Sequence, residues 1–350
     1  MSAMSRELDW HLAHADQQSI RTIYFGGGTP SVIAPSHIGK LIDQLTHNRP
    51  LDNDVEITVE INPDDVSEAV IREWKAMGVN RFSMGVQSFD DAVLKWMNRA
   101  HAAEQADRAI KTLQDAGLTN ITIDLIYGHG RHETMTWEQD VERFLSYQTP
   151  HISAYALTVE EKTALGYFTE KGEYAPMHDE SVVHQFLDLH QQLTQAGFEH
   201  YELSNYARSG FQSKHNTSYW QGIPFWGIGP SAHGFDGHAT RRMNINNNAR
   251  YVKAWNHGEL KDAFEIEHLS PVQLANEYWM TGLRTAQGVD LNAFEMRWGL
   301  PLEKENARLM DKWISSNHLA LQENRLTCTP TGWMVMDAIL SDMFLTETKN

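Results

Sequence analysis

The most suggestive chemistry in the chain begins at a run of glycines. Residues 23–31 read IYFGGGTPS, so a short apolar segment ends in Gly26, Gly27 and Gly28 and continues into Thr29. Glycine is used where the backbone turns at positive φ or where a ligand approaches the main chain closely. Because three glycines exceed what a turn requires, we expect a loop that contacts a ligand. A flexible connection between a strand and a helix is the alternative.

Two common phosphate-binding loops are excluded by the residues that follow. A Walker loop requires Gly-Lys-Ser/Thr, which is missing after the glycine run. A dinucleotide-binding loop requires a glycine where this chain has Ser31.

Polar residues recur on one face of three further expected strands. The polar sets are Glu56, Thr58 and Glu60; Ser83, Gly85 and Gln87; and Thr122 and Asp124. The polar character of each face is strongest near the C-terminal end of its strand, where Glu60, Gln87 and Asp124 lie. Active sites of parallel α/β barrels lie at these ends, so we expect the three residues to line a site. For any one strand, a solvated edge is the alternative.

A third region with chemical potential spans residues 214–233. It contains His215 and His233, two tryptophans and five glycine or proline residues. This composition suits a loop that lines a ligand. A core loop with buried histidines is the alternative, because histidine is often partly buried.

The elements that position these residues alternate along the chain. Strand-like runs occur at residues 22–26, 55–61, 80–86, 119–126 and 151–157, and amphipathic helical segments at 36–47, 66–77, 90–116 and 137–147. Such βα units form a parallel sheet with right-handed crossovers. Residues 5–18 look like the remainder of a helix, which suggests that something N-terminal is absent.

After residue 157 the alternation weakens. We expect a helix at 179–196, a strand at 199–206, helices at 247–257, 271–286 and 301–316, a hairpin at 319–329 and a last helix. The final helices and hairpin resemble a winged-helix unit. The expected divisions are 1–210 for the partial barrel, 211–246 for a loop and strand segment, and 247–350 for a mostly helical domain.

Composition narrows the class of protein. The net charge of −17 argues against nucleic acid as a partner, so we expect the winged-helix unit to pack or to bind protein. The single cysteine, Cys328, excludes a disulfide framework and any cysteine-ligated cluster built from this chain alone, while 18 histidines leave histidine ligation open. No membrane span or signal peptide is recognisable, so we expect a cytoplasmic protein.

Several motifs together resemble a known family. They are YFGGGTPS at 24–31, EINP at 60–63, GVQSF at 85–89, DLIYG at 124–128, HISAY at 151–155, YELSN at 201–205, HNxxYW at 215–220, and GLR at 282–284 with GVD at 288–290. The first four resemble radical S-adenosylmethionine (radical SAM) proteins related to oxygen-independent coproporphyrinogen III dehydrogenase. The others are similar to the heme chaperone HemW branch of that family, over roughly residues 5–345.

The resemblance implies a fold and a cofactor site. The fold would be an incomplete (β/α)6 barrel lacking its first strand, followed by the winged-helix-like domain. The residues implied at the S-adenosylmethionine site are Gly27, Gly28, Thr29, Glu60, Gln87, Arg99 and Asp124. The glycine motif would meet the methionine moiety of the cofactor through its backbone.

The resemblance also implies a function. His215 matches a histidine proposed to contact heme, and the branch would deliver heme to an apo-protein, with a peripheral membrane protein as a possible recipient. The rival is an oxygen-independent coproporphyrinogen III oxidase of porphyrin biosynthesis, so whether the chain is an enzyme is left open. A heme-binding relative that never carried an iron–sulfur cluster is a third hypothesis.

Two departures from the family pattern bear on these expectations. The family motif C-x-x-x-C-x-x-C, which holds a [4Fe–4S] cluster, does not occur in this chain. We therefore expect an N-terminally shortened member whose complete form holds the cluster; a natural cluster-free relative is the alternative. Residues 127–132 read YGHGRH where the family has a proline, which is expected to alter the loop beside Asp124.

Overall fold

The computed structural model describes residues 1–350 except 16–17, 132–134, 300–303 and 347–350. The chain divides into two compact units. Unit 1 contains Met1–Thr22, Ser36–Val55 and Ser213–Asn350, and unit 2 contains Ile23–Pro35 and Glu56–Gln212. Each unit is therefore assembled from segments that are distant in sequence.

An open parallel sheet organises unit 2 and extends along the two strands that cross the unit boundary. Among the described residues its strand order is β1-β2-β3-β4-β5-β7-β6, with parallel pairing from β2 to β5. The strands are β1 Ile20–Phe25, β2 Leu51–Ile61, β3 Arg81–Gln87, β4 Ile121–Tyr127, β5 His151–Ala156, β6 Glu199–Glu202 and β7 Asn205–Ala207. The expected partial barrel is confirmed.

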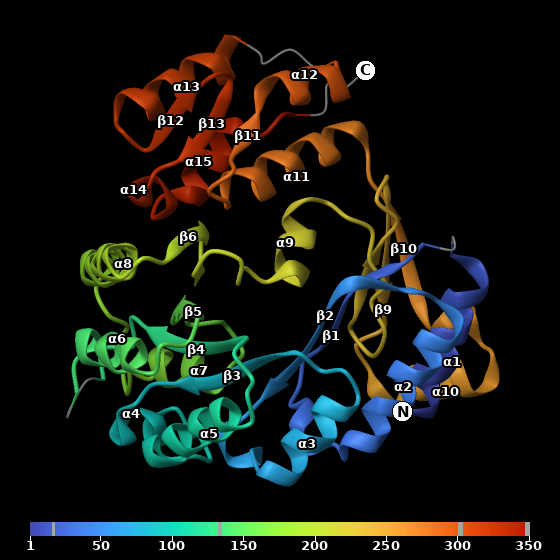
Figure 1. Ribbon diagram of the computed structural model, residues 1–350. Coiled ribbons are helices and arrows are strands. Elements are labelled where there is room, and N and C mark those ends of the chain that lie inside the picture. The colour runs from blue at the N-terminus through green and yellow to red at the C-terminus, as the bar shows by residue number, and fades with distance from the viewer. Residues whose placement is uncertain (16–17, 132–134, 300–303, 347–350) are drawn as a thin grey trace. The chain divides into compact units, whose positions relative to one another are not determined.

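Helices cover one face of this sheet. They are α3 Glu68–Ala76, α4 Asp91–Trp96, α5 Ala103–Asp115, α6 Trp137–Ser146, α7 Ala164–Glu170 and α8 Asp179–Gln195, and Figure 1 shows α4, α5 and α6 beside β3 and β4. Strand residues such as Phe82, Met84 and Ile123 are fully buried and alternate with the polar positions. This two-residue period separates an apolar helix-covered face from a polar face.

Turn chemistry ends the helices where the sequence indicated. Gly78 and Gly117 follow α3 and α5 with φ of +87° and +74°, the left-handed conformation that closes a helix. Asp90 caps α4 by accepting a hydrogen bond from the Ala92 N–H at 2.8 Å. Ser67 caps α3, so this helix begins two residues later than expected.

Two expected elements differ in detail, and one helix was not expected. The helix expected at 90–116 is divided into α4 and α5, because Asn98 turns the chain with φ of +54°. The strand expected at 199–206 is a hairpin, β6–β7, that pairs antiparallel with β5. Helix α7 was not expected at all. Residues 301–303 of the helix expected at 301–316 lie outside the described residues, and α13 covers Lys304–Ser315.

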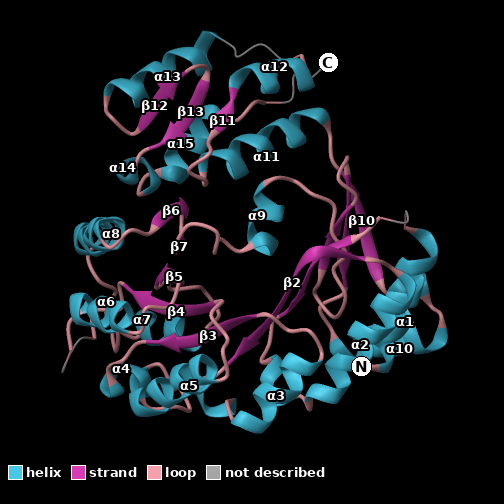
Figure 2. Ribbon diagram, in the orientation of Figure 1, coloured by secondary structure: helices cyan, strands magenta, loops and turns pink. Residues whose placement is uncertain are grey.

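Unit 1 contains two smaller sheets, both antiparallel (Figure 2). The first, β8 His233–Phe235, β9 Thr240–Asn244 and β10 Phe264–His268, accompanies helices α1 Ser2–His14, α2 Pro35–Asn48 and α10 Asn248–His257. The second joins β11 Val289–Asp290 to the expected hairpin, β12 Leu319–Gln322 and β13 Arg325–Cys328. With α11 Pro271–Leu283, α12 Leu291–Trp298, α13, α14 Pro330–Trp333 and α15 Met336–Met343, it forms the expected winged-helix-like domain.

No helix in the described part of the chain is both long and apolar enough to cross a membrane.

Candidate functional site

The pairing register brings the expected polar residues onto one face of the unit 2 sheet. Glu60 lies beside Ser83, Gly85 beside Asp124, and Asp124 beside Ser153 on the next strand. Deep in the sheet this face is closed, since Thr58, Thr122 and His151 are buried. It becomes accessible toward the C-terminal strand ends, where Tyr155 is 45% exposed. The polar residues therefore lie together at the strand ends where the pattern predicted them.

The glycine run and Glu60 form one part of this site. The Tyr24 hydroxyl donates a hydrogen bond to Glu60 Oε1 at 2.7 Å, and the Gly27 N–H donates to Oε2 at 3.2 Å. A Cβ at Gly26 would collide with the Glu60 and Tyr24 side chains. Gly27 has φ of +79°, and a Cβ at Gly28 would meet nothing within 4 Å. The loop thus needs glycine for its geometry and leaves its backbone accessible to a ligand.

Asp124 is the second carboxyl group of the site. The Ser83 hydroxyl lies 3.1 and 3.2 Å from its two oxygens, and Ser153 on β5 provides a further hydrogen bond. Burial raises the pKa of Asp124 to about 7, and the two serine hydrogen bonds oppose that rise. Near neutral pH this carboxyl is therefore present in both protonation states.

Gln87 and Arg99 meet at Gly85. Gln87 has φ of +70° at an irregularity in the β3–β4 pairing, and Arg99 Nη2 donates to the Gly85 carbonyl at 3.4 Å. A Cβ on Gly85 would lie 2.8 Å from Gln87 Nε2 and 3.1 Å from Arg99 Nη2. Burial lowers the pKa of Arg99, while the carboxylates of Asp64 and Asp124 counteract this effect.

Thr29 follows the glycines and precedes the 3-10 helix Pro30–Val32, whose Val32 N–H donates to the Thr29 carbonyl at 3.1 Å. The residues expected at the S-adenosylmethionine site thus all belong to unit 2.

Sequence reasoning missed several polar residues on the same face. They are Tyr24, Ser153, Tyr155, Glu202 and Asn205. Glu202 is buried on β6, and Asn205 Nδ2 donates to its carboxyl group. Burial raises the pKa of Glu202 to about 7, with the Asn205 and Ser204 hydrogen bonds opposing. Alternation in HISAYA was a usable signal for Ser153 and Tyr155, whereas Glu202 enters through a hairpin that the sequence did not indicate.

The loop beside Asp124 departs from the family pattern at residues 127–132. Gly128 and Gly130 turn it with φ of +78° and +64°. His129 is buried, with its ring 6.1 Å from that of Trp96. His132 lies outside the described residues.

His215 belongs to unit 1 and sits on a short helix, α9 Lys214–Trp220. The Ser213 side chain caps this helix by accepting from the Asn216 N–H. His215 Nδ1 lies 2.8 Å from Thr22 Oγ1, and Nε2 lies 2.9 Å from the Tyr219 hydroxyl. Burial lowers the pKa of His215 to about 4, so the imidazole is neutral at physiological pH, which is the form that ligates a metal ion.

The rest of the region expected to line a ligand has a structural explanation. Glu7 of α1 is fully buried, pairs with Arg242, and accepts hydrogen bonds from the Gly229 N–H at 2.8 Å and from Asn244 Nδ2 at 2.7 Å. The His11 and Trp226 rings stack with centroids 5.2 Å apart. His233 begins strand β8 and is exposed. This loop is held by packing within unit 1.

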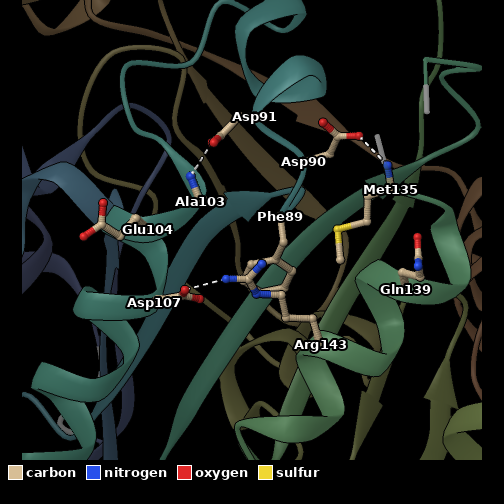
Figure 3. Close-up of a pocket in the computed structure, with 9 residues that line it drawn as sticks. All are labelled: Phe89, Asp90, Asp91, Ala103, Glu104, Asp107, Met135, Gln139 and Arg143. Atoms are coloured by element: carbon tan, nitrogen blue, oxygen red, sulfur yellow. Dashed lines mark hydrogen bonds and ion pairs between the residues drawn. The ribbon is translucent and has the colours of Figure 1, made fainter. Parts of the chain in front are cut away.

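An open cleft of about 580 Å³ lies away from the polar sheet face, between α4, α5 and α6 (Figure 3). Its polar side chains already have partners: Asp90 accepts from the Met135 N–H at 3.0 Å, Asp91 from the Ala103 N–H at 2.8 Å, and Asp107 pairs with Arg143. These contacts cap and join the helices, and we assign the cleft no ligand.

The residues of this chain do not fit an iron–sulfur cluster. Cys328 is buried in the C-terminal hairpin, and burial raises the pKa of its thiol to about 12, which disfavours the thiolate that binds metal. Within the described residues no group of three or more His, Cys, Asp or Glu side chains could hold a metal ion.

Comparison with known proteins assigns the chain to a family. The Radical SAM superfamily model matches residues 6–143, and the HemN C-terminal domain model matches residues 269–335. The heme chaperone HemW of Lactococcus lactis is 32% identical over 94% of this chain and 86% of that protein. The chain belongs to the HemW family of radical SAM proteins. HemW of Bacillus subtilis is 30% identical over 87% of this chain and 80% of its own length.

A mitochondrial protein and a solved enzyme structure are also similar to this chain. The mitochondrial radical S-adenosyl methionine domain-containing protein 1 of Mus musculus is 31% identical over 92% of this chain and 75% of that protein. The structure of coproporphyrinogen III oxidase (HemN) from Escherichia coli aligns with a TM-score of 0.79 over 98% of this chain and 82% of that chain. At 20% identity, this likeness establishes a shared fold.

Proposed function

We propose that this HemW-family protein binds heme through His215 and delivers it to an apo-protein. The observation that carries the proposal is the state of the His215 ring, which is neutral and held at Nδ1 by Thr22. Imidazole is a common axial ligand of heme iron, and a second hydrogen bond at the other ring nitrogen orients such ligands. Relatives at about 30% identity carry the name heme chaperone, which supports the same function.

We further propose that the polar sheet face of unit 2 holds S-adenosylmethionine. Glu60 and Asp124 supply carboxyl oxygens that accept hydrogen bonds from an ammonium group or from hydroxyls, both of which this cofactor carries. The open backbone at Gly27 and Gly28 admits close approach, while Gln87, Arg99 and Thr29 complete the border.

Cofactor binding is tested by calorimetry with S-adenosylmethionine. Glu60→Gln and Asp124→Asn keep the side-chain shape but remove the negative charge, so each is expected to weaken binding about tenfold or more. Gln114→Glu, on the exposed side of α5, changes the net charge without touching the site and is the control. Wild-type affinity in both site variants would remove these carboxylates from the site.

Radical chemistry of the coproporphyrinogen oxidase type is a weaker candidate for this chain. It requires an electron delivered by a [4Fe–4S] cluster, and the chain supplies one cysteine. The cluster therefore belongs to the proposal only for a form of the protein that carries the cysteine motif. No reaction step is assigned to the present residues.

Heme binding is tested by titrating hemin into the protein and following its absorption. Replacing the ligand removes the iron–nitrogen bond, so His215→Ala is expected to lose about tenfold or more in affinity. His238→Ala, an exposed histidine of the β8–β9 turn, should bind as the wild type does. Undiminished affinity in His215→Ala would refute the assignment of this ligand.

A further inference from the structure

Each ring nitrogen of His215 lies within hydrogen-bond distance of a hydroxyl group. Thr22 Oγ1 lies 2.8 Å from Nδ1, and the Tyr219 hydroxyl lies 2.9 Å from Nε2. A neutral imidazole carries one N–H and one lone pair, so one of the two hydroxyls donates and the other accepts. When Thr22 accepts a hydrogen bond from Nδ1–H, the lone pair lies on Nε2, and the Tyr219 hydroxyl donates to it.

The Tyr219 hydroxyl occupies the space that an iron atom needs. A metal–imidazole bond is about 2 Å long and follows the lone pair of the nitrogen. An oxygen 2.9 Å away and hydrogen-bonded to Nε2 lies along the same direction. Iron and the tyrosine hydroxyl therefore exclude each other at this nitrogen.

The helix spacing and ring packing of Tyr219 hold its hydroxyl at Nε2, and its exposure allows the side chain to move away. It follows His215 by four residues on α9, a spacing that places both side chains on one face of the helix. Its ring meets Phe225 edge to face, with centroids 4.6 Å apart and an interplanar angle of 86°. At 41% exposure, Tyr219 is still open to solvent, so its side chain has room to rotate outward.

We propose that Tyr219 is an internal competitor for the iron-binding nitrogen of His215, which weakens heme binding and speeds heme release. Thr22 has the opposite role, because its hydroxyl holds the tautomer and ring orientation that ligation requires. A group that reoccupies the ligand nitrogen as the cargo departs favours release, which is what a carrier requires. The inference rests on the proposed heme-binding function of His215.

The test compares hemin affinity and release in matched variants. Tyr219→Phe removes only the hydroxyl, and the net value of one hydrogen bond gives roughly three- to tenfold tighter binding. Hemin loss to excess apomyoglobin should slow correspondingly. Thr22→Val, which keeps the side-chain shape, should weaken binding. Tyr167→Phe, an exposed tyrosine on α7, should change neither quantity.

A second readout needs no heme. Nitrogen-15 NMR of the His215 imidazole should report the Nδ1–H tautomer in the wild type, and the Nε2 resonance should shift in Tyr219→Phe. An unshifted resonance overturns the proposal, as does Tyr219→Phe with wild-type affinity and release. Weaker hemin binding in Tyr219→Phe also overturns it and makes Tyr219 a supporting group.

The two proposals fail in different ways. If His215→Ala binds hemin like the wild type, the ligand assignment falls together with the inference. If His215→Ala loses hemin while Tyr219→Phe matches the wild type, only the competitor role falls.

Discussion

Single residues of the polar sheet face carry charge that depends on pH. Asp124 is held by two serines in a poorly solvated position, and its pKa rises to about 7 because burial disfavours the carboxylate. Glu202 is raised to about 7 by the same cause. A ligand that needs these groups ionised would gain affinity as the pH rises through 7.

The buried Asp124 makes stability fall as the pH rises. Its folded-state pKa of about 7 exceeds the ordinary value of 3.8, so the folded protein binds this proton more tightly than the unfolded chain does. This contribution is complete below about pH 4 and is lost as the pH rises through 7, by at most roughly 1.4 kcal/mol per pH unit. Asp124→Asn removes the dependence.

Urea unfolding at pH 5 and pH 8 measures the effect. Asp124→Asn should gain stability relative to the wild type as the pH increases, whereas Asp115→Asn, at an exposed position, should not. A constant difference between Asp124→Asn and the wild type would contradict the raised pKa.

Among the elements, a buried arginine connects neighbouring strands at the solvent-inaccessible end of the polar sheet face. Arg81 lies 3.6 Å from Glu56 on β2, and both side chains are almost fully buried. It donates to Asn120 Oδ1 at 2.7 Å and to Thr122 Oγ1 at 2.8 Å. One side chain thus connects three neighbouring strands below the site.

Arg81→Met should destabilise the protein by about 3–5 kcal/mol, because it removes the cation beside a buried carboxylate. Adding Glu56→Gln should recover part of the loss. The free energy of unfolding in urea measures both. Arg72→Met breaks an exposed pair with Glu68, and a change below about 1 kcal/mol is expected there. Equal losses at both arginines would contradict the importance of burial.

The sequence predicted those elements whose pattern is local. Alternation of apolar and polar residues located β2, β3 and β4 and their polar ends at Glu60, Gln87 and Asp124. Successive side chains of a strand point to opposite faces, so the pattern can be read from the sequence. Interruptions within a helical pattern were harder to predict. The turn at Asn98, which separates α4 from α5, depends on the positive φ of one residue. A strand segment was expected within residues 211–246, but β10 was not expected, nor was the pairing of β8, β9 and β10 into one sheet, because the glycine-rich residues before β8 read as a loop.

Contacts between distant segments were beyond sequence reasoning. Nothing near Thr22 indicates that its hydroxyl meets His215, which lies 193 residues later. Glu202 reaches the polar sheet face only because β7 pairs with β5, and register between strands is a property of the folded chain. The family motifs named the candidate site residues, and the structure places further polar residues on the same sheet face.

Across the chain as a whole, Glu7 connects helix α1 to residues 229–251. It is fully buried in unit 1 and meets Arg242, Asn244, Tyr251 and the Gly229 backbone. Glu7→Ala should cost about 3–5 kcal/mol, because it leaves a buried arginine without its carboxylate. The rate of amide hydrogen exchange in α1 should increase in the same variant. Glu295→Ala, exposed on α12, should alter neither, and protected α1 amides in Glu7→Ala would contradict this role.

The discontinuity of unit 1 also matters while the protein is being made. Arg242 leaves the ribosome 235 residues after Glu7, which at about 5–20 residues per second is a wait of roughly 10 to 50 seconds. Throughout that time α1 has a carboxylate and apolar side chains whose partners have not been synthesised. Nascent chains of this protein therefore present an unsatisfied helix α1 that cellular chaperones can bind, and unit 1 completes its folding only after residues 229–251 have been synthesised.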